Sequence, residues 1–128
     1  MLSSYLMKRN MKILAFDQST KISGWSFFES SQYVDSGVID LHLSTESTEK
    51  RSEKMAVGIC SVIEKYKPDV VIIEEVAMQS NAKTLKLLAR IQGVAIGFCA
   101  AHNIKLYILE PSKWRSALHY RQGSGVKR

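Results

Sequence analysis

Hydrophobic residues recur along this chain in short runs typical of strands and in spaced stripes typical of helices. The apolar run from Lys12 to Asp17 ends in an acid and a polar turn, which predicts a buried strand. Gly24 to Phe28 and Tyr33 to Ile39 predict two more strands, close enough for an antiparallel meander. Val70 to Glu75 is apolar until two acids appear, as expected for a central strand covered on both faces. Ile104 to Leu109 is the fifth predicted strand.

Three helices are predicted between and after these strands. The first begins near Ser44 and is marked by an apolar stripe at helical spacing, formed by Met55, Ile59, Val62, Ile63 and Tyr66. The second runs from about Asn81 to His102, and its Gly93 and Gly97, one turn apart, are expected to let it approach the sheet closely. A short third helix is predicted over residues 111–118. The order β-β-β-α-β-α-β-α predicts an α/β fold, a mixed five-stranded sheet with helices on both faces.

The composition fits one soluble domain of 128 residues. Residues 1–10 carry no apolar pattern, and we expect them to form a disordered or tag-like extension before a domain at 11–128. That extension does not resemble a signal peptide, and the longest apolar run is interrupted by Arg90, so we expect a cytoplasmic protein without a membrane partner. Cys60 and Cys99 are predicted to be unpaired core residues.

Charge is distributed unevenly along the chain. Residues 1–75 hold nine Lys and Arg against eleven Asp and Glu, whereas residues 76–128 hold nine Lys and Arg against Glu110 alone. The balance is therefore −2 in the first part and +8 in the second. A basic half of this kind favours a polyanionic partner such as DNA, because each cation near a phosphate releases condensed counterions.

Three acids at strand ends need a physical explanation: Asp17, Glu74 and Glu75 each follow an otherwise apolar strand. Partial burial of an unpaired carboxylate is costly unless a basic group, a proton or a divalent cation compensates. A shared Mg²⁺ would do so, because this ion prefers one or two carboxylates with waters and phosphate oxygens. Side chains alternate along a strand, so only one of the two glutamates can join Asp17. The alternative is that these acids only solvate the edge of the sheet or cap the following helix.

Two segments resemble the signatures of the RuvC-type Holliday-junction resolvases. Residues 13–21 (ILAFDQSTK), continuing to Gly24, are similar to the first strand of that family, whose aspartate begins the metal site. Residues 72–76 (IIEEV), with the helix that follows, are similar to the second signature. In this match Asp17 and Glu74 take the positions of the catalytic aspartate and glutamate, and the resemblance extends over residues 11–128.

The resemblance implies a ribonuclease H-like fold and a structure-selective endonuclease of DNA recombination and repair. Such an enzyme cleaves four-way DNA junctions as a homodimer by Mg²⁺-dependent phosphodiester hydrolysis, with Mn²⁺ as a possible substitute. It makes Asp17 and Glu74 the catalytic metal ligands and Glu75 a less favoured ligand.

The sequence departs from the family pattern in two places. The family completes its metal site with two more acids on a C-terminal helix, and after Glu75 this sequence offers only Glu110, which matches neither position. We therefore expect a chain truncated at its C-terminus that cleaves DNA poorly or not at all. An aromatic residue that family members can stack near the junction centre corresponds here to Ala77.

Basic side chains of the second half are the predicted phosphate contacts. Lys83, Lys86 and Arg90 are spaced to share the polar face of the second helix, and the later candidates are Lys113, Arg115, Lys127 and Arg128. Trp25 and Trp114 are predicted to pack in the fold rather than to stack on bases.

Two other functions remain open from the sequence. Residues 16–20 (FDQST) also resemble the phosphate-contacting strand and turn of actin-like and sugar-kinase nucleotide-binding domains, although Glu74 and Glu75 would repel phosphate. The chain could also be a non-catalytic DNA-binding module, in which case neutralising Asp17 would leave junction binding unchanged.

Overall fold

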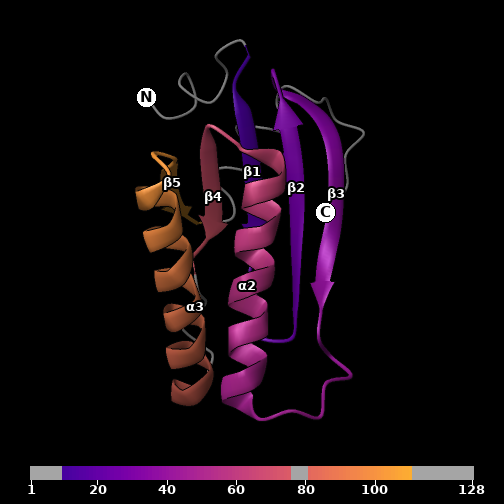
Figure 1. Ribbon diagram of the computed structural model, residues 1–128, viewed down its shortest axis with the longest axis vertical. Helices are drawn as coiled ribbons and strands as arrows, with labels where there is room; N and C mark the ends of the chain where they lie inside the picture. The colour runs from indigo at the N-terminus through magenta and orange to yellow at the C-terminus, as the bar shows by residue number, and fades with distance from the viewer. Residues whose placement is uncertain (1–9, 76–80, 111–128) are drawn as a thin grey trace.

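A computed structural model describes residues 10–75 and 81–110 as a single sheet with two helices packed against it (Figure 1). The strands are β1 (Lys12–Asp17), β2 (Ile22–Glu29), β3 (Gln32–Asp40), β4 (Val70–Glu74) and β5 (Lys105–Leu109). Their order across the sheet is β3-β2-β1-β4-β5. The pairs β1–β2 and β2–β3 are antiparallel, and the pairs β1–β4 and β4–β5 are parallel. The predicted mixed five-stranded sheet, with its first three strands antiparallel, is confirmed.

Helices α2 (Thr48–Tyr66) and α3 (Ala82–Ala101) lie side by side on the same face of this sheet (Figure 1). Alternate residues of the central strands, such as Leu14 and Phe16 of β1, join buried residues of both helices in one core cluster. The intervening residues, such as Ile13 and Ala15, belong to a second cluster on the opposite face. The described helices therefore cover one face only; the third helix, predicted over residues 111–118, lies outside the described residues.

Side-chain caps define where both helices begin. The Ser47 hydroxyl accepts a hydrogen bond from the Lys50 backbone N–H, and the Asn81 side chain accepts one from the Thr84 N–H at 2.9 Å. The predicted start of α2 near Ser44 is too early, because the Ser44 hydroxyl instead accepts the backbone N–H of Glu46 in a local turn.

The predicted close approach at Gly93 and Gly97 is wrong. Both residues are exposed on α3, and a Cβ atom added at either would meet nothing within 4 Å. The close approach is at Gly58 of α2, where an added Cβ would lie 2.9 Å from the Ile39 Cγ2 atom of β3. The apolar stripe of a helix alone does not reveal which of its glycines faces the sheet.

An aromatic cluster joins the end of α2 to the outer antiparallel strands. The Tyr66 ring lies 5.2 Å from the Trp25 ring and 4.6 Å from the Phe27 ring, measured between centroids. Its hydroxyl donates a hydrogen bond to the carboxylate of Asp35 in β3. Trp25 is thus a packing residue, as predicted. Trp114 lies outside the described residues.

The remaining core predictions have mixed outcomes. Cys60 and Cys99 are both unpaired, as predicted, and burial raises the pKa of the Cys99 thiol to about 11. Helix α3 contains the apolar run that Arg90 interrupts, and it is nevertheless long and apolar enough to cross a membrane by length and composition alone. That match is weak evidence for a membrane segment, since core helices pass the same test, and α3 packs against α2 and β5.

The contact at Gly58 can be tested by adding one methyl group. We expect Gly58→Ala to lower the free energy of unfolding by about 1–2 kcal/mol, because overpacking against Ile39 outweighs the helix propensity of alanine. Gly97→Ala is the matched control on an open helix surface and should be neutral or stabilising. Urea denaturation measures both; equal stability of the two variants would contradict the packing described.

The bond between Tyr66 and Asp35 should make part of the stability depend on pH. This bond is the main cause that lowers the pKa of the Asp35 carboxyl below its ordinary value. A carboxyl with a lowered folded-state pKa stabilises the fold above its unfolded pKa, near pH 4, and loses this contribution as pH falls through the folded value. We expect wild type to exceed Tyr66→Phe in stability at pH 7 and the difference to shrink below about pH 4. Thermal unfolding across pH measures this; a constant difference would refute it.

Candidate metal centre

Asp17 and Glu74 lie next to each other on one face of the sheet, at the ends of its two central strands. The parallel pairing of β1 and β4 matches Phe16 with Ile73 as its last registered pair, so the two acids follow as the next residues in step. Asp17 alternates with Ala15, and Glu74 with Ile72, both of which belong to the cluster on the face opposite α2 and α3. Neighbouring strands lie about 4.8 Å apart, a separation that two carboxylates can bridge through one cation.

A glycine leaves space beside this pair of acids. Gly24 of β2 is paired with Asp17, so a side chain at this position would stand on the same face. An added Cβ atom at Gly24 would meet nothing within 4 Å. On the other side, Glu74 is paired with Leu109 of β5. The acids thus have an open neighbour on the β2 side and an apolar neighbour on the β5 side.

The two acids differ in exposure. Glu74 is half-buried, in agreement with the expected partial desolvation, whereas Asp17 is exposed, so that the burial argument does not apply to it. The salt bridges around α2 and at the end of β3 do not include Asp17. Its carboxylate therefore needs no buried counter-charge, and its placement next to Glu74 is what favours a metal.

Glu75 is the first residue after β4 and is exposed. If the alternation of the strand continues to this residue, its side chain is on the other side of the strand from Glu74. Its backbone N–H donates a hydrogen bond of 2.9 Å to the Leu109 carbonyl, which fixes the chain beyond β4. Among residues 10–75 and 81–110, no group of three or more His, Cys, Asp or Glu side chains is arranged to hold a metal. The described residues thus offer the carboxylates of Asp17 and Glu74, two ligands of the kind that Mg²⁺ combines with water.

The turn after β1 is held by polar contacts that the sequence patterns did not reveal. The Ser23 hydroxyl, fully buried, accepts the Ser19 backbone N–H at 2.9 Å and donates to the Ser19 carbonyl at 3.0 Å. The Gln18 side chain crosses to α3, where its Nε2 donates to the Leu88 carbonyl at 2.9 Å. In the sequence these polar residues indicate only a turn, because their hydrogen-bond partners depend on the tertiary structure.

The basic residues of α3 begin at the same end of the molecule as the acids. β4 runs towards the end of the sheet at which α3 begins (Figure 1). Lys83, Lys86 and Arg90 are all exposed on the first half of this helix. The other predicted phosphate contacts, and the residue that corresponds to the family's stacking aromatic, lie outside the described residues; they are Lys113, Arg115, Lys127, Arg128 and Ala77.

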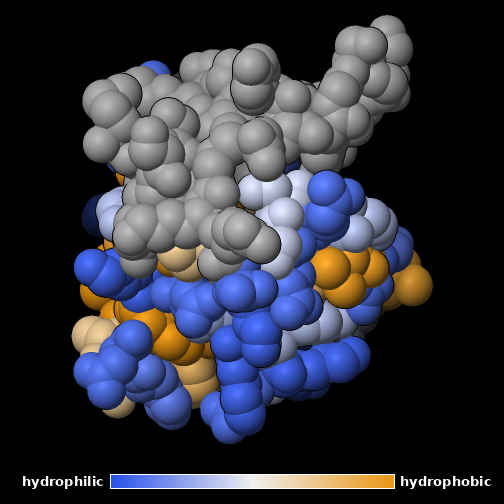
Figure 2. Space-filling model, turned by 90° about the horizontal axis from the view of Figure 1, so that it is seen from above, coloured by the Kyte–Doolittle hydropathy of each residue, from blue (hydrophilic) through white to orange (hydrophobic). Residues whose placement is uncertain are grey.

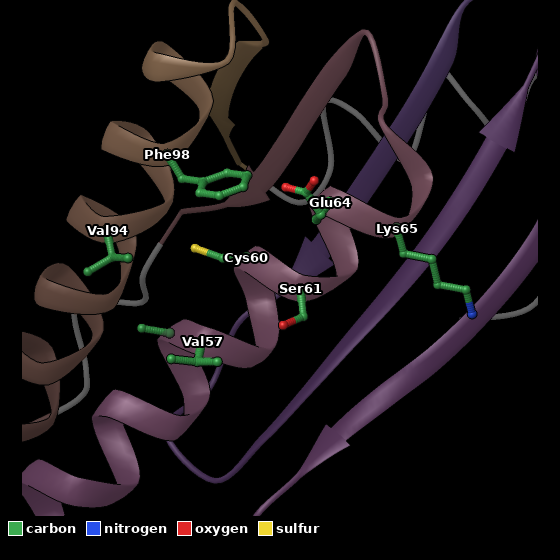
Figure 3. A pocket seen from close by; sticks show the side chains of 8 residues that line it. Val57, Cys60, Ser61, Glu64, Lys65, Val94 and Phe98 are labelled. Carbon is green, nitrogen blue, oxygen red and sulfur yellow. The ribbon is translucent and has the colours of Figure 1, made fainter.

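An open hollow of about 490 Å³ lies away from the acids, between α2 and α3 (Figure 3). Its lining includes Val57 and Cys60 of α2 with Val94 and Phe98 of α3, and the Cys60 sulfur points towards α3. The helices cover the face opposite the acids, so this hollow is separate from the candidate metal centre. The end of the molecule opposite the acids shows separate hydrophobic patches between hydrophilic residues (Figure 2).

The sheet order and the two central acids place this chain in the class of ribonuclease H-like proteins. The model of the family described as "Crossover junction endodeoxyribonuclease RuvC" matches residues 13–125. RuvC of Caldicellulosiruptor saccharolyticus is 30% identical over 112 residues, which cover 84% of this chain and 68% of that relative. RuvC of Legionella pneumophila is 30% identical over 99 residues, which cover 74% of this chain and 56% of that relative.

A solved structure, "T. thermophilus RuvC in complex with Holliday junction substrate", shares this fold with a TM-score of 0.70. The two chains are 12% identical, and the match covers 83% of this chain and 68% of that one. The chain belongs to the RuvC family. It spans between about half and about two thirds of the length of the curated relatives named above.

Proposed function

We propose that this chain is the nuclease domain of a Holliday-junction endonuclease, in which Asp17 and Glu74 together hold a divalent cation. The observation that supports this proposal is the register of β1 and β4, in which the two acids directly follow the last paired residues. Membership of the RuvC family supports the activity, since that family is named for cleavage at crossover junctions and is generally dependent on a divalent metal. The proposed ion is Mg²⁺, with Mn²⁺ as a substitute.

Each part of the site has a physical role in this proposal. A bound divalent ion supplies an activated water and stabilises charge on the phosphate oxygens. Asp17, exposed, and Glu74, half-buried, hold the ion at the surface of the sheet, where a DNA backbone can reach it. Gly24 leaves room for that backbone beside Asp17. Lys83, Lys86 and Arg90 are on the helix that covers the other face of the sheet, and they contact phosphates away from the ion and position the DNA.

The partners follow from the same proposal. The substrate is a four-way junction or other branched DNA, and the Thermus relative was solved with such a junction. Cleavage of two strands at one junction needs two active sites, so we propose a homodimer that acts in the cytoplasm in recombination and repair. The family match favours this function over the nucleotide-binding alternative. If the chain does not bind a divalent metal, the alternative that remains is a non-catalytic DNA-binding module.

Metal binding tests the role of the two acids. We expect wild type to bind Mn²⁺ and both Asp17→Asn and Glu74→Gln to bind it at least tenfold more weakly, because each variant removes one of two charged ligands. Electron paramagnetic resonance of free Mn²⁺ measures the dissociation constant. Glu75→Gln is the matched control, with the same change one residue away on the opposite side of the strand, and should bind as wild type does. Equal weakening in all three variants would refute the assignment.

DNA binding tests the role of the basic helix. We expect Lys86→Gln to weaken binding of a synthetic four-way junction and to reduce the slope of log K against log salt by about one. The control is Lys65→Gln, which removes the same charge from the exposed surface near the end of α2, far from the acids. Fluorescence anisotropy over a range of salt concentrations measures both variants; the same loss from Lys65→Gln would show that only net charge matters.

A further inference from the structure

The backbone pairing between β1 and β4 ends one residue before the two acids. Asp17 is paired with Gly24 of β2, and Glu74 is paired with Leu109 of β5. Each acid is therefore held by the strand on its outer side. Between β1 and β4 the last registered pair is Phe16 with Ile73. The separation of the two carboxylates thus depends on other contacts that fix the end of β1 relative to the end of β4.

One side-chain hydrogen bond connects the end of β1 to α3. Gln18 follows Asp17 directly, and its Nε2 donates at 2.9 Å to the Leu88 carbonyl of α3, across 70 positions of sequence. The bond is partly buried, and Leu88 itself is 7% exposed in the core beneath α3. Gln18 therefore connects the end of β1 to α3. This helix packs against β5, the strand that is paired with Glu74.

The amide of Gln18 is not explained by packing. Its Oε1 atom is buried and has no hydrogen-bond partner among the described residues. A buried acceptor without a partner destabilises a fold, whereas an apolar side chain of the same length would fill this space without that cost. The single bond to Leu88 offsets the cost only in part. Gln18 is therefore better explained by a role in positioning the end of β1 than by a contribution to the stability of the fold.

We propose that Gln18 is a positioning residue that sets the separation of Asp17 and Glu74 and so tunes the affinity of the metal centre. This inference rests on the proposed function, because it takes the two acids as metal ligands. Gln18 acts from the helix-covered side of the sheet through the backbone of the adjacent Asp17, and it does not touch the metal. Side chains that orient metal ligands in this way commonly change metal affinity by about 10–100-fold when they are removed.

The test makes one chemical change at three glutamines of the full chain. Gln18→Met keeps the length of the side chain and removes the donor to Leu88. Gln92→Met makes the same change at a buried glutamine, 8% exposed on α3, and Gln32→Met makes it at an exposed position of β3. Mn²⁺ affinity by electron paramagnetic resonance and unfolding in urea are measured for each variant and for wild type.

We expect Gln18→Met to bind Mn²⁺ about tenfold more weakly than wild type, while its urea midpoint stays within the range of the two control variants. Gln92→Met and Gln32→Met should bind Mn²⁺ as wild type does. Wild-type affinity in Gln18→Met would overturn the inference, and so would an equal loss of affinity in Gln92→Met, since general loosening of the core would then explain it. If wild type itself binds no Mn²⁺, the proposed metal centre fails, which is a distinct result.

Discussion

The parallel pairing of β1 with β4 is the constraint on which the rest of this structure depends. It matches two strands that lie more than fifty positions apart in sequence, and its register carries Asp17 and Glu74 to the same level of the sheet. A shift of one residue in either strand would turn one acid towards the helices and separate the pair. The buried side chains of Phe16 and Ile73 fix that register, because both must face the helices to stay in the core.

The two faces of the sheet have different roles: one forms the core with the helices, and the other carries the two acids. One face is filled by α2 and α3, whose buried residues join those of β1, β2 and β4 in one core cluster. The close contact of Gly58 with Ile39 and the aromatic cluster around Tyr66 hold α2 against the antiparallel strands. The other face carries the two acids where each strand leaves the core. A rigid core thus positions two polar side chains that could not remain close together in a flexible segment.

The polar network around the turn after β1 joins these two parts. Ser23, buried in β2, shapes the turn by accepting and donating hydrogen bonds to the backbone of Ser19. Gln18 connects the same turn to α3, the helix that carries the exposed basic residues. The turn therefore contacts both the strand end that carries Asp17 and the helix that carries the exposed basic residues.

The sequence by itself determined the elements, the mixed sheet and the two acids, because strand runs, helical stripes and the alternation of side chains are local properties. The same alternation predicted that only one of Glu74 and Glu75 can join Asp17, and the family resemblance favoured Glu74. Only the tertiary structure decided that Gly58, rather than Gly93 or Gly97, meets the sheet, that Asp17 is exposed, and that Gln18 reaches Leu88. These features depend on which surfaces meet across long distances in sequence, and no local pattern encodes that.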